Sequence, residues 1–168
     1  MILRALLSIT LIWPFAIAAK GVYQTPDDFV KQTLGDQAET KVIWLDASLR
    51  NHIETILQHD YNGHRIRYWR DNQRTLWILE EIGKTKPITT GIVISNHQIQ
   101  TIKVLVFRES RGWEVKHAFF TNQFKQASLT DENRLDRHID GISGATLSVR
   151  ALTKLARIAL LLDSHLSS

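Results

Sequence analysis

The chain has 168 residues and a formal net charge of +4, with 43% hydrophobic and 23% charged residues. This length and composition are typical of one globular domain with its own hydrophobic core. The chain has no cysteine, which excludes disulfides, thiolate-ligated iron–sulfur clusters and haem attached through Cys-x-x-Cys-His, so any redox activity needs another cofactor. The scattered basic residues argue against nucleic acid as a partner, whereas the positive charge suits a phosphate or a membrane surface.

The first 18 residues have the features of an export signal. Arg4 precedes a short apolar stretch, and Ala16-Ile17-Ala18 fits the small-x-small pattern for cleavage after Ala18. We therefore predict a signal peptide over residues 1–18 and an exported protein, periplasmic in a bacterium with an outer membrane. The alternative is a retained N-terminal anchor, which the short apolar length and Pro14 disfavour. Peripheral association with a membrane is compatible with either outcome.

Residues 19–84 are predicted to form the N-terminal part of the domain. Thr25-Pro26-Asp27-Asp28 marks a helix start and Gly35 a helix stop. A β-prone run covers 42–45, and Asp46 or Ser48 is expected to cap a second helix over 49–58. Two alternating runs, 65–69 and 75–79, flank a polar turn at 71–73 and predict a hairpin.

Two groups of residues in this part have both a structural and a functional interpretation. His52 and His59 are seven residues apart, whereas metal-binding pairs on a helix are normally four apart, so we favour solvated side chains over a metal site. Trp69 and Trp77 are either core residues or stacking partners of a cofactor. Packing in the core is the more common role of strand aromatics, and we favour it.

The C-terminal half predicts a second hairpin and a long terminal helix. The strands cover 88–95 and 99–107, with Ile102, Val104 and Val106 on one face of the second strand. Leu105 and Phe107 occupy its other face, so we expect both faces to be covered. The helix over 147–162 should bury one apolar face, while a basic stripe is expected to be solvated, with docking to an anionic partner as the alternative. This stripe comprises Arg150, Lys154 and Arg157. Together these elements predict a single α+β domain with a central antiparallel sheet flanked by helices.

The densest group of small and polar residues precedes that terminal helix, at Asp140-Gly141-Ile142-Ser143-Gly144-Ala145-Thr146. Glycines allow positive φ and the close approach of another molecule, and the unpaired amides at a helix start suit a phosphate. An ordinary turn with a helix N-cap is the simpler interpretation of such a stretch.

Asp-x-x-Ser-Gly-Ala-Thr resembles the flavinylation motif of the FMN-binding domain family, which includes the C subunit of the sodium-pumping NADH:quinone reductase and the G subunit of the Rnf complex. The resemblance implies FMN bound covalently to Thr146 by a phosphoester bond, installed from FAD by a flavin transferase that uses a divalent metal. Asp140 and Ser143 match further motif positions, and Gly141, Gly144 and Ala145 complete the candidate cofactor-binding turn. The hairpin from Gly91 onward and Phe119-Phe120-x-x-Gln123-Phe124 also resemble the family, so we predict an FMN-binding core over residues 85–168.

The loop after the last predicted strand departs from the family. Respiratory relatives have Glu-Thr-Pro-Gly-Leu-Gly bordering the flavin, and this chain keeps Glu109 and Gly112 but lacks the proline. Glu109, Arg111 and Trp113 are the candidate cofactor contacts here. An arginine can pair with a phosphate or a reduced flavin, and a tryptophan can cover the ring. The departure argues against a subunit of a respiratory pump.

The resemblance implies an exported electron-transfer flavoprotein that is more an electron carrier than a turnover enzyme. A chain with one flavin needs outside donors and acceptors, so we expect a membrane-bound redox partner besides the flavin transferase. We assign no catalytic residue and no resident metal. Two alternatives remain: a flavin-dependent reductase of a small substrate, although no glycine-rich nicotinamide motif is present, and a non-redox FMN-binding sensory module.

Overall fold

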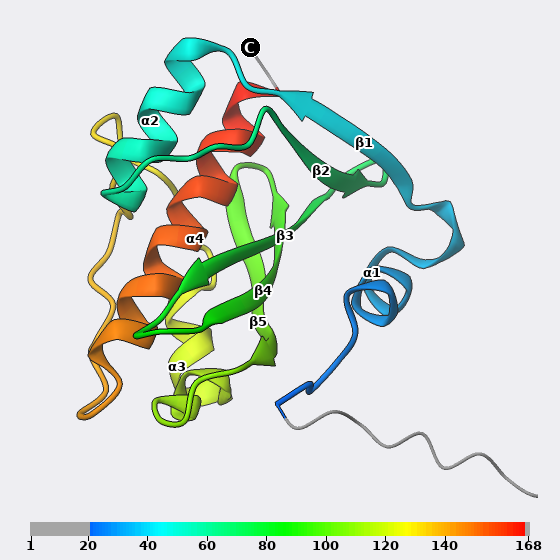
Figure 1. Ribbon diagram of the computed structural model, residues 1–168. Coiled ribbons are helices and arrows are strands. Elements are labelled where there is room, and N and C mark those ends of the chain that lie inside the picture. The colour runs from blue at the N-terminus through cyan, green and yellow to red at the C-terminus, as the bar shows by residue number, and fades with distance from the viewer. Residues whose placement is uncertain (1–20, 167–168) are drawn as a thin grey trace, which may run out of the picture.

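The computed structural model describes residues 21–166, so the predicted signal peptide lies outside the described residues. Its centre is a five-stranded antiparallel sheet in which the strands follow one another in chain order (Figure 1). The strands are β1 (Glu39–Trp44), β2 (Arg65–Arg70), β3 (Thr75–Ile82), β4 (Pro87–Ser95) and β5 (Gln98–Phe107). Both predicted hairpins, β2–β3 and β4–β5, are confirmed.

Helices cover both faces of this sheet. They are α1 (Pro26–Leu34), α2 (Ala47–Leu57), α3 (Ala118–Thr121) and α4 (Thr146–His165), with short 3₁₀ turns η1 (Gly35–Gln37), η2 (Trp113–Lys116) and η3 (Asn122–Phe124). The long α4 lies along one face beside α2, and α1 lies on the other side (Figure 1). The predicted α+β domain with a C-terminal helix is therefore confirmed. Among residues 21–166, no helix combines the length and apolar character needed to cross a bilayer.

The helix ends follow from local capping. Thr25 Oγ1 accepts from the backbone N–H of Asp28 at 3.1 Å, and Asp46 Oδ1 accepts from that of Leu49 at 2.7 Å. These bonds satisfy amides that have no partner inside the helix. Asp46, and not Ser48, is thus the cap of α2.

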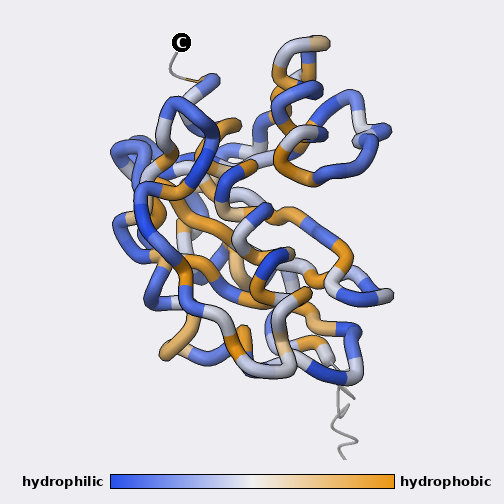
Figure 2. The backbone as a smooth tube through the Cα atoms, turned by 90° about the vertical axis from the view of Figure 1, so that its left-hand side faces the viewer, coloured by the Kyte–Doolittle hydropathy of each residue, from blue (hydrophilic) through white to orange (hydrophobic). Residues whose placement is uncertain are grey.

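The core consists of two clusters, one on each face of the sheet. The larger lies under α2 and α4 and contains Trp77, which is fully buried and stacks on Tyr68 at 4.8 Å between ring centres. The smaller lies under α1, where Phe29 packs on Gly91 so closely that a Cβ there would be 2.3 Å from the ring. Trp69 packs against this second cluster. Figure 2 shows the hydrophobic segments running through the middle of the molecule.

One strand prediction is wrong because β5 contains a bulge. Thr89 pairs with Val106 and Thr90 with Val104, which leaves Leu105 as an extra residue. An extra residue reverses the alternation of faces beyond it. Val104 therefore packs under α4, whereas Val106 packs under α1, and the expected shared face ends at the bulge.

The expectation of solvated side chains is also wrong at Lys154. Its Nζ lies 3.1 Å from Glu81 Oε1 and 2.5 Å from the carbonyl oxygen of Leu57, and only 14% of the side chain is exposed. His59, half exposed, places Nε2 3.1 Å from the other oxygen of the buried Glu81. Arg157 of the same stripe is half-buried and donates to the carbonyl of Asn133 at 2.5 Å. These side chains tie α4 to α2, β3 and the preceding loop.

Candidate functional site

The turn before α4 presents Thr146 at the surface. Gly144 has φ +80°, and Ala145 donates its backbone N–H to the carbonyl of Ile142 at 2.9 Å, which closes the turn. The helix then begins at Thr146, with Ala145 as the N-cap residue and no side chain capping it. Thr146 is therefore not the N-cap. Its exposed hydroxyl makes no hydrogen bond within residues 21–166, although the buried Ala145 beside it fixes the backbone.

A cavity of about 530 Å³ adjoins this helix start. Three segments form it: the turn between β3 and β4, the loop after β5, and the first turn of α4. Its lining residues are Lys84, Glu109, Ser110, Arg111 and residues 144–148. The structure thus brings together five of the residues predicted from sequence: Glu109, Arg111, Gly144, Ala145 and Thr146.

The other four predicted residues lie outside this cavity. Gly141 and Ser143 are exposed in the turn, and the carboxylate of Asp140 is also exposed, 3.7 Å from His138. The backbone N–H of Asp140 donates to Gln123 Oε1 at 2.7 Å, which holds the start of the turn. Trp113 turns its ring toward His117, 5.4 Å away between ring centres.

Glu109 is held by the turn between β3 and β4. Its Oε1 accepts from the backbone N–H groups of Lys84, Thr85 and Lys86 at 2.5, 2.6 and 2.9 Å. Desolvation acts to raise the pKa of Glu109, but the three N–H bonds outweigh it and hold the pKa below its ordinary value. The charged carboxylate therefore fastens two walls of the cavity together.

Gly112 joins the loop after β5 to the helix start. It has φ +84°, and a Cβ there would lie 2.6 Å from Oγ of the buried Ser148 and 3.4 Å from Cβ of Ala145. Only a glycine allows this close approach without a shift of one partner. The loop and the first turn of α4 are consequently one packed unit.

The free charges in the cavity are positive. Arg111 and Lys84 line it, and neither forms an ion pair within the described part of the chain. The uncapped helix end adds unpaired amides and a partial positive charge. This donor set fits a phosphate. Among residues 21–166, no three histidine or carboxylate side chains are arranged to hold a metal ion.

Four further residues line the cavity without having been predicted from the sequence: Lys84, Ser110, Leu147 and Ser148. The two lysines of the Gly83-Lys84-Thr85-Lys86 turn were the available signal for a basic wall. Nothing in the sequence pattern connects that turn to Glu109, which lies more than 20 residues further along the chain.

Comparison with known proteins supports the cofactor assignment. Residues 83–161 match the model of a family described as FMN-binding domain, and a search among curated proteins found no match to the chain. The matched region contains all three segments that line the cavity beside Thr146. Residues 83–161 therefore match an FMN-binding domain, and this match supports a flavin-binding protein.

Proposed function

We propose that this protein is an exported electron carrier with FMN bound covalently to Thr146. The observation that carries this proposal is the position of the Thr146 hydroxyl: exposed, without a hydrogen-bond partner in the described chain, and at the edge of a basic cavity. A hydroxyl in this position is accessible to a modifying enzyme. The helix start and the packed Ala145 hold its backbone in place.

The attachment follows from the resemblance of residues 140–146 to the flavinylation motif. A flavin transferase would cleave the pyrophosphate of FAD, so that Thr146 Oγ1 bonds to the FMN phosphorus, AMP leaves, and the hydroxyl proton is lost to a base. Bound FMN would supply the one- or two-electron chemistry that the side chains of this chain lack.

The cavity residues have distinct roles in this proposal. Arg111, Lys84 and the first amides of α4 would bind the negative phosphodiester. Glu109 positions the loop that carries Arg111, because its carboxylate is bound to the neighbouring turn. Asp140 forms no hydrogen bond with Thr146 within residues 21–166, and its exposed carboxylate is available to act on the transferase or its metal during attachment.

An exposed aromatic patch beside the site is the proposed docking surface for a membrane-bound redox partner. We define this aromatic patch as Tyr23, Trp113, Lys116, His117 and Phe119. Trp113 and Phe119 are 45% and 64% exposed, and Lys116 Nζ lies 4.1 Å from the centre of the Tyr23 ring. Aromatic residues are enriched at protein interfaces. The patch follows Gly112, which packs on the start of α4, so a partner bound there would lie close to the flavin.

Intact mass after co-expression with a flavin transferase tests the attachment. We expect the wild type to gain the mass of FMN less one water, and Thr146→Ala to gain nothing. Ser143→Ala is the matched control, since its hydroxyl lies in the same turn but outside the cavity, and it should still be modified. A wild type that stays unmodified in the presence of an active transferase would refute the proposal.

Redox assays separate the carrier from its alternatives. A carrier should be yellow, bleach with dithionite and exchange electrons with a membrane fraction. Turnover with a soluble donor and acceptor alone would indicate a flavin-dependent reductase. A flavin that dithionite does not reduce would indicate a sensory module.

Export is tested by fractionation and N-terminal sequencing of the mature chain. We expect the protein in the extracytoplasmic fraction, beginning at Ala19 after cleavage of residues 1–18. An intact N-terminus in the membrane fraction would indicate a retained anchor instead.

A further inference from the structure

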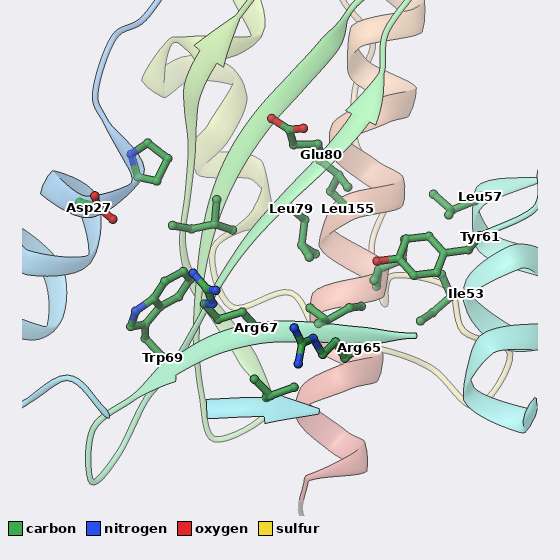
Figure 3. Close-up of a pocket in the computed structure, with 15 residues that line it drawn as sticks. Asp27, Ile53, Leu57, Tyr61, Arg65, Arg67, Trp69, Leu79, Glu80 and Leu155 are labelled. Carbon is green, nitrogen blue, oxygen red and sulfur yellow. The ribbon is translucent and has the colours of Figure 1, made fainter. Parts of the chain in front are cut away.

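A second cavity lies where the sheet splits between β2 and β3. These strands pair at only three positions, from Tyr68 with Trp77 to Arg70 with Thr75. β2 nevertheless pairs with β1 along its whole length, and β3 pairs with β4 along its own. Figure 3 shows β2 running at a wide angle to β3 beyond their shared hairpin. The sheet therefore consists of two parts separated by a wedge.

Two strand edges face this wedge without a strand partner in the part of the chain that the structure describes. In an antiparallel ladder, hydrogen-bonded and non-hydrogen-bonded residue pairs alternate. The β1–β2 ladder is fixed by the bond from Leu45 N–H to His64 O, and the β3–β4 ladder by that from Gly83 N–H to Lys86 O. By this alternation, Arg67 is a non-hydrogen-bonded residue of the β1–β2 ladder, and Ile78 is one of the β3–β4 ladder. The backbone N–H and C=O groups of Arg67 therefore point away from β1 and those of Ile78 away from β4, both toward the wedge. Within the described residues, no pairing is made between these two positions.

The wedge encloses a cavity of about 670 Å³, a size typical of small-molecule sites. Its inner wall is aliphatic, with Ile53 and Leu57 from α2 and Leu155 and Ile158 from α4, each no more than 4% exposed. Tyr61 points its hydroxyl toward the middle of the cavity (Figure 3), and burial raises the pKa of Tyr61. The interior is therefore suited to a hydrocarbon, with one neutral phenol beside it.

The mouth of the cavity is basic. Arg65 and Arg67 line it from β2 (Figure 3), and neither forms an ion pair among residues 21–166. Glu80, on the opposite side, already accepts hydrogen bonds from the hydroxyl of Thr89 and from Arg108. Asp27 is the other acidic residue at the mouth and lies in the first turn of α1, where the helix dipole stabilises it. With Glu80 bound to Arg108, the two arginines outnumber Asp27, so the mouth has a net positive charge.

We propose that this cavity binds an amphipathic organic anion, with its hydrocarbon body between α2 and α4 and its carboxylate or phosphate head at Arg65 and Arg67. An isoalloxazine ring is disfavoured there, because its carbonyl and N–H groups would find few partners along the aliphatic wall. The site is separate from Thr146, which lies at the start of α4 and does not line this cavity. It therefore does not depend on the flavin proposal.

Titration of the purified protein with a fluorescent fatty acid, dansylundecanoate, tests this site. We expect saturable binding of one probe per chain. The double variant Arg65→Ala/Arg67→Ala should weaken binding about fivefold or more, since it removes both charges that would pair with the anionic head at the mouth. Arg70→Ala is the matched control, because Arg70 is an exposed arginine of β2 outside the cavity, and its affinity should be unchanged. Thr146→Ala should bind like the wild type, which keeps this test independent of flavin attachment.

A cavity-filling variant and two ligand sources complete the test. Leu79→Trp should abolish probe binding, with circular dichroism and thermal unfolding showing that the variant is folded. Displacement of the probe by oleate would show that a free fatty acid is sufficient to occupy the cavity. If the wild type co-sediments with phosphatidylglycerol vesicles and Leu79→Trp does not, the ligand is the acyl chain of a lipid. No saturable binding, or binding that neither the double arginine variant nor Leu79→Trp weakens, would overturn the proposal.

Discussion

The carboxylate of Glu109 accepts a 2.6 Å hydrogen bond from the backbone N–H of Thr85, so a side chain that follows β5 is fixed to the turn between β3 and β4. Lys84 and Lys86 donate to the same oxygen. The loop that carries Arg111 is therefore oriented before any cofactor binds. Such preorganisation reduces the ordering that binding would otherwise require.

Replacing Glu109 by Gln should loosen this connection. A neutral amide oxygen accepts less strongly than a carboxylate, so we expect a loss of about 1–2 kcal/mol in the free energy of unfolding in urea at pH 7. The pKa of Glu109 is lowered in the folded protein, so its contribution is present above the ordinary pKa of 4.5 and is lost as the pH falls below it. The difference between variant and wild type should shrink accordingly from pH 5 downward. Glu132→Gln, at an exposed surface carboxylate, is the control and should change little.

The two glycines of the flavinylation turn should respond differently to alanine. A Cβ has open space at both, but Gly144 has φ +80° and Gly141 does not adopt a positive φ. Gly144→Ala should therefore lower the free energy of unfolding by about 1 kcal/mol and slow flavin attachment. Gly141→Ala should behave like the wild type in thermal unfolding and in a time course of intact mass. Equal effects of the two substitutions would contradict this account of the turn.

Gly112 and Ser148 should be energetically coupled. Gly112→Ala would place a Cβ 2.6 Å from Ser148 Oγ and impose φ +84° on an alanine. We expect a loss of about 2–3 kcal/mol in stability, from the backbone strain and the clash together. Ser148→Ala removes the clashing oxygen, so the double variant should recover part of this loss in a double-mutant cycle. Additive effects of the two substitutions on the free energy of unfolding would show that the two residues do not interact.

Much of this architecture could be predicted from the sequence, because local signals specify most of its elements. Thr25 and Asp46 cap α1 and α2, and alternating residues mark both hairpins. The bulge at Leu105 could not be predicted, since the extra residue is another apolar side chain that preserves the hydrophobic pattern.

The site was predictable where its residues belong to recognisable motifs, in the turn at 144–146 and in the loop that contains Glu109 and Arg111. Residues 144–146 carry their own motif and line the cavity. Lys84 becomes part of the cavity only through tertiary contact, because Glu109 holds the turn that contains Lys84 beside the loop after β5. The split between β2 and β3 was missed for a similar reason, because both sequences have ordinary strand periodicity and only the three-dimensional pairing shows where they separate.

The aromatic patch should affect electron exchange with membranes and not flavin attachment. Replacing Trp113 and Phe119 by Ser removes two of its exposed rings. We expect the rate of reduction by a membrane fraction to fall about tenfold, as for the loss of a modest hot spot. Intact mass and bleaching by dithionite should remain unchanged. Trp44→Ser is the control, since Trp44 is 66% exposed on β1 and its substitution should leave the rate unaltered.

Because His59 and Lys154 both bind the buried Glu81, the protonation of His59 should affect how much stability is lost when Lys154 is replaced. The hydrogen bond to the Asp60 carbonyl and then that to Glu81 raise the pKa of His59 above 6.5. A raised pKa contributes stability that is present below pH 6.5 and is lost as the pH rises through the folded-state value. Lys154→Met leaves His59 as the remaining cation beside Glu81, so breaking the buried pair should cost about 3 kcal/mol at pH 9 and clearly less at pH 6. Urea unfolding at both values measures this difference, with Arg150→Met on the same helix as the exposed control. An equal loss at the two pH values would show that His59 does not compensate Glu81.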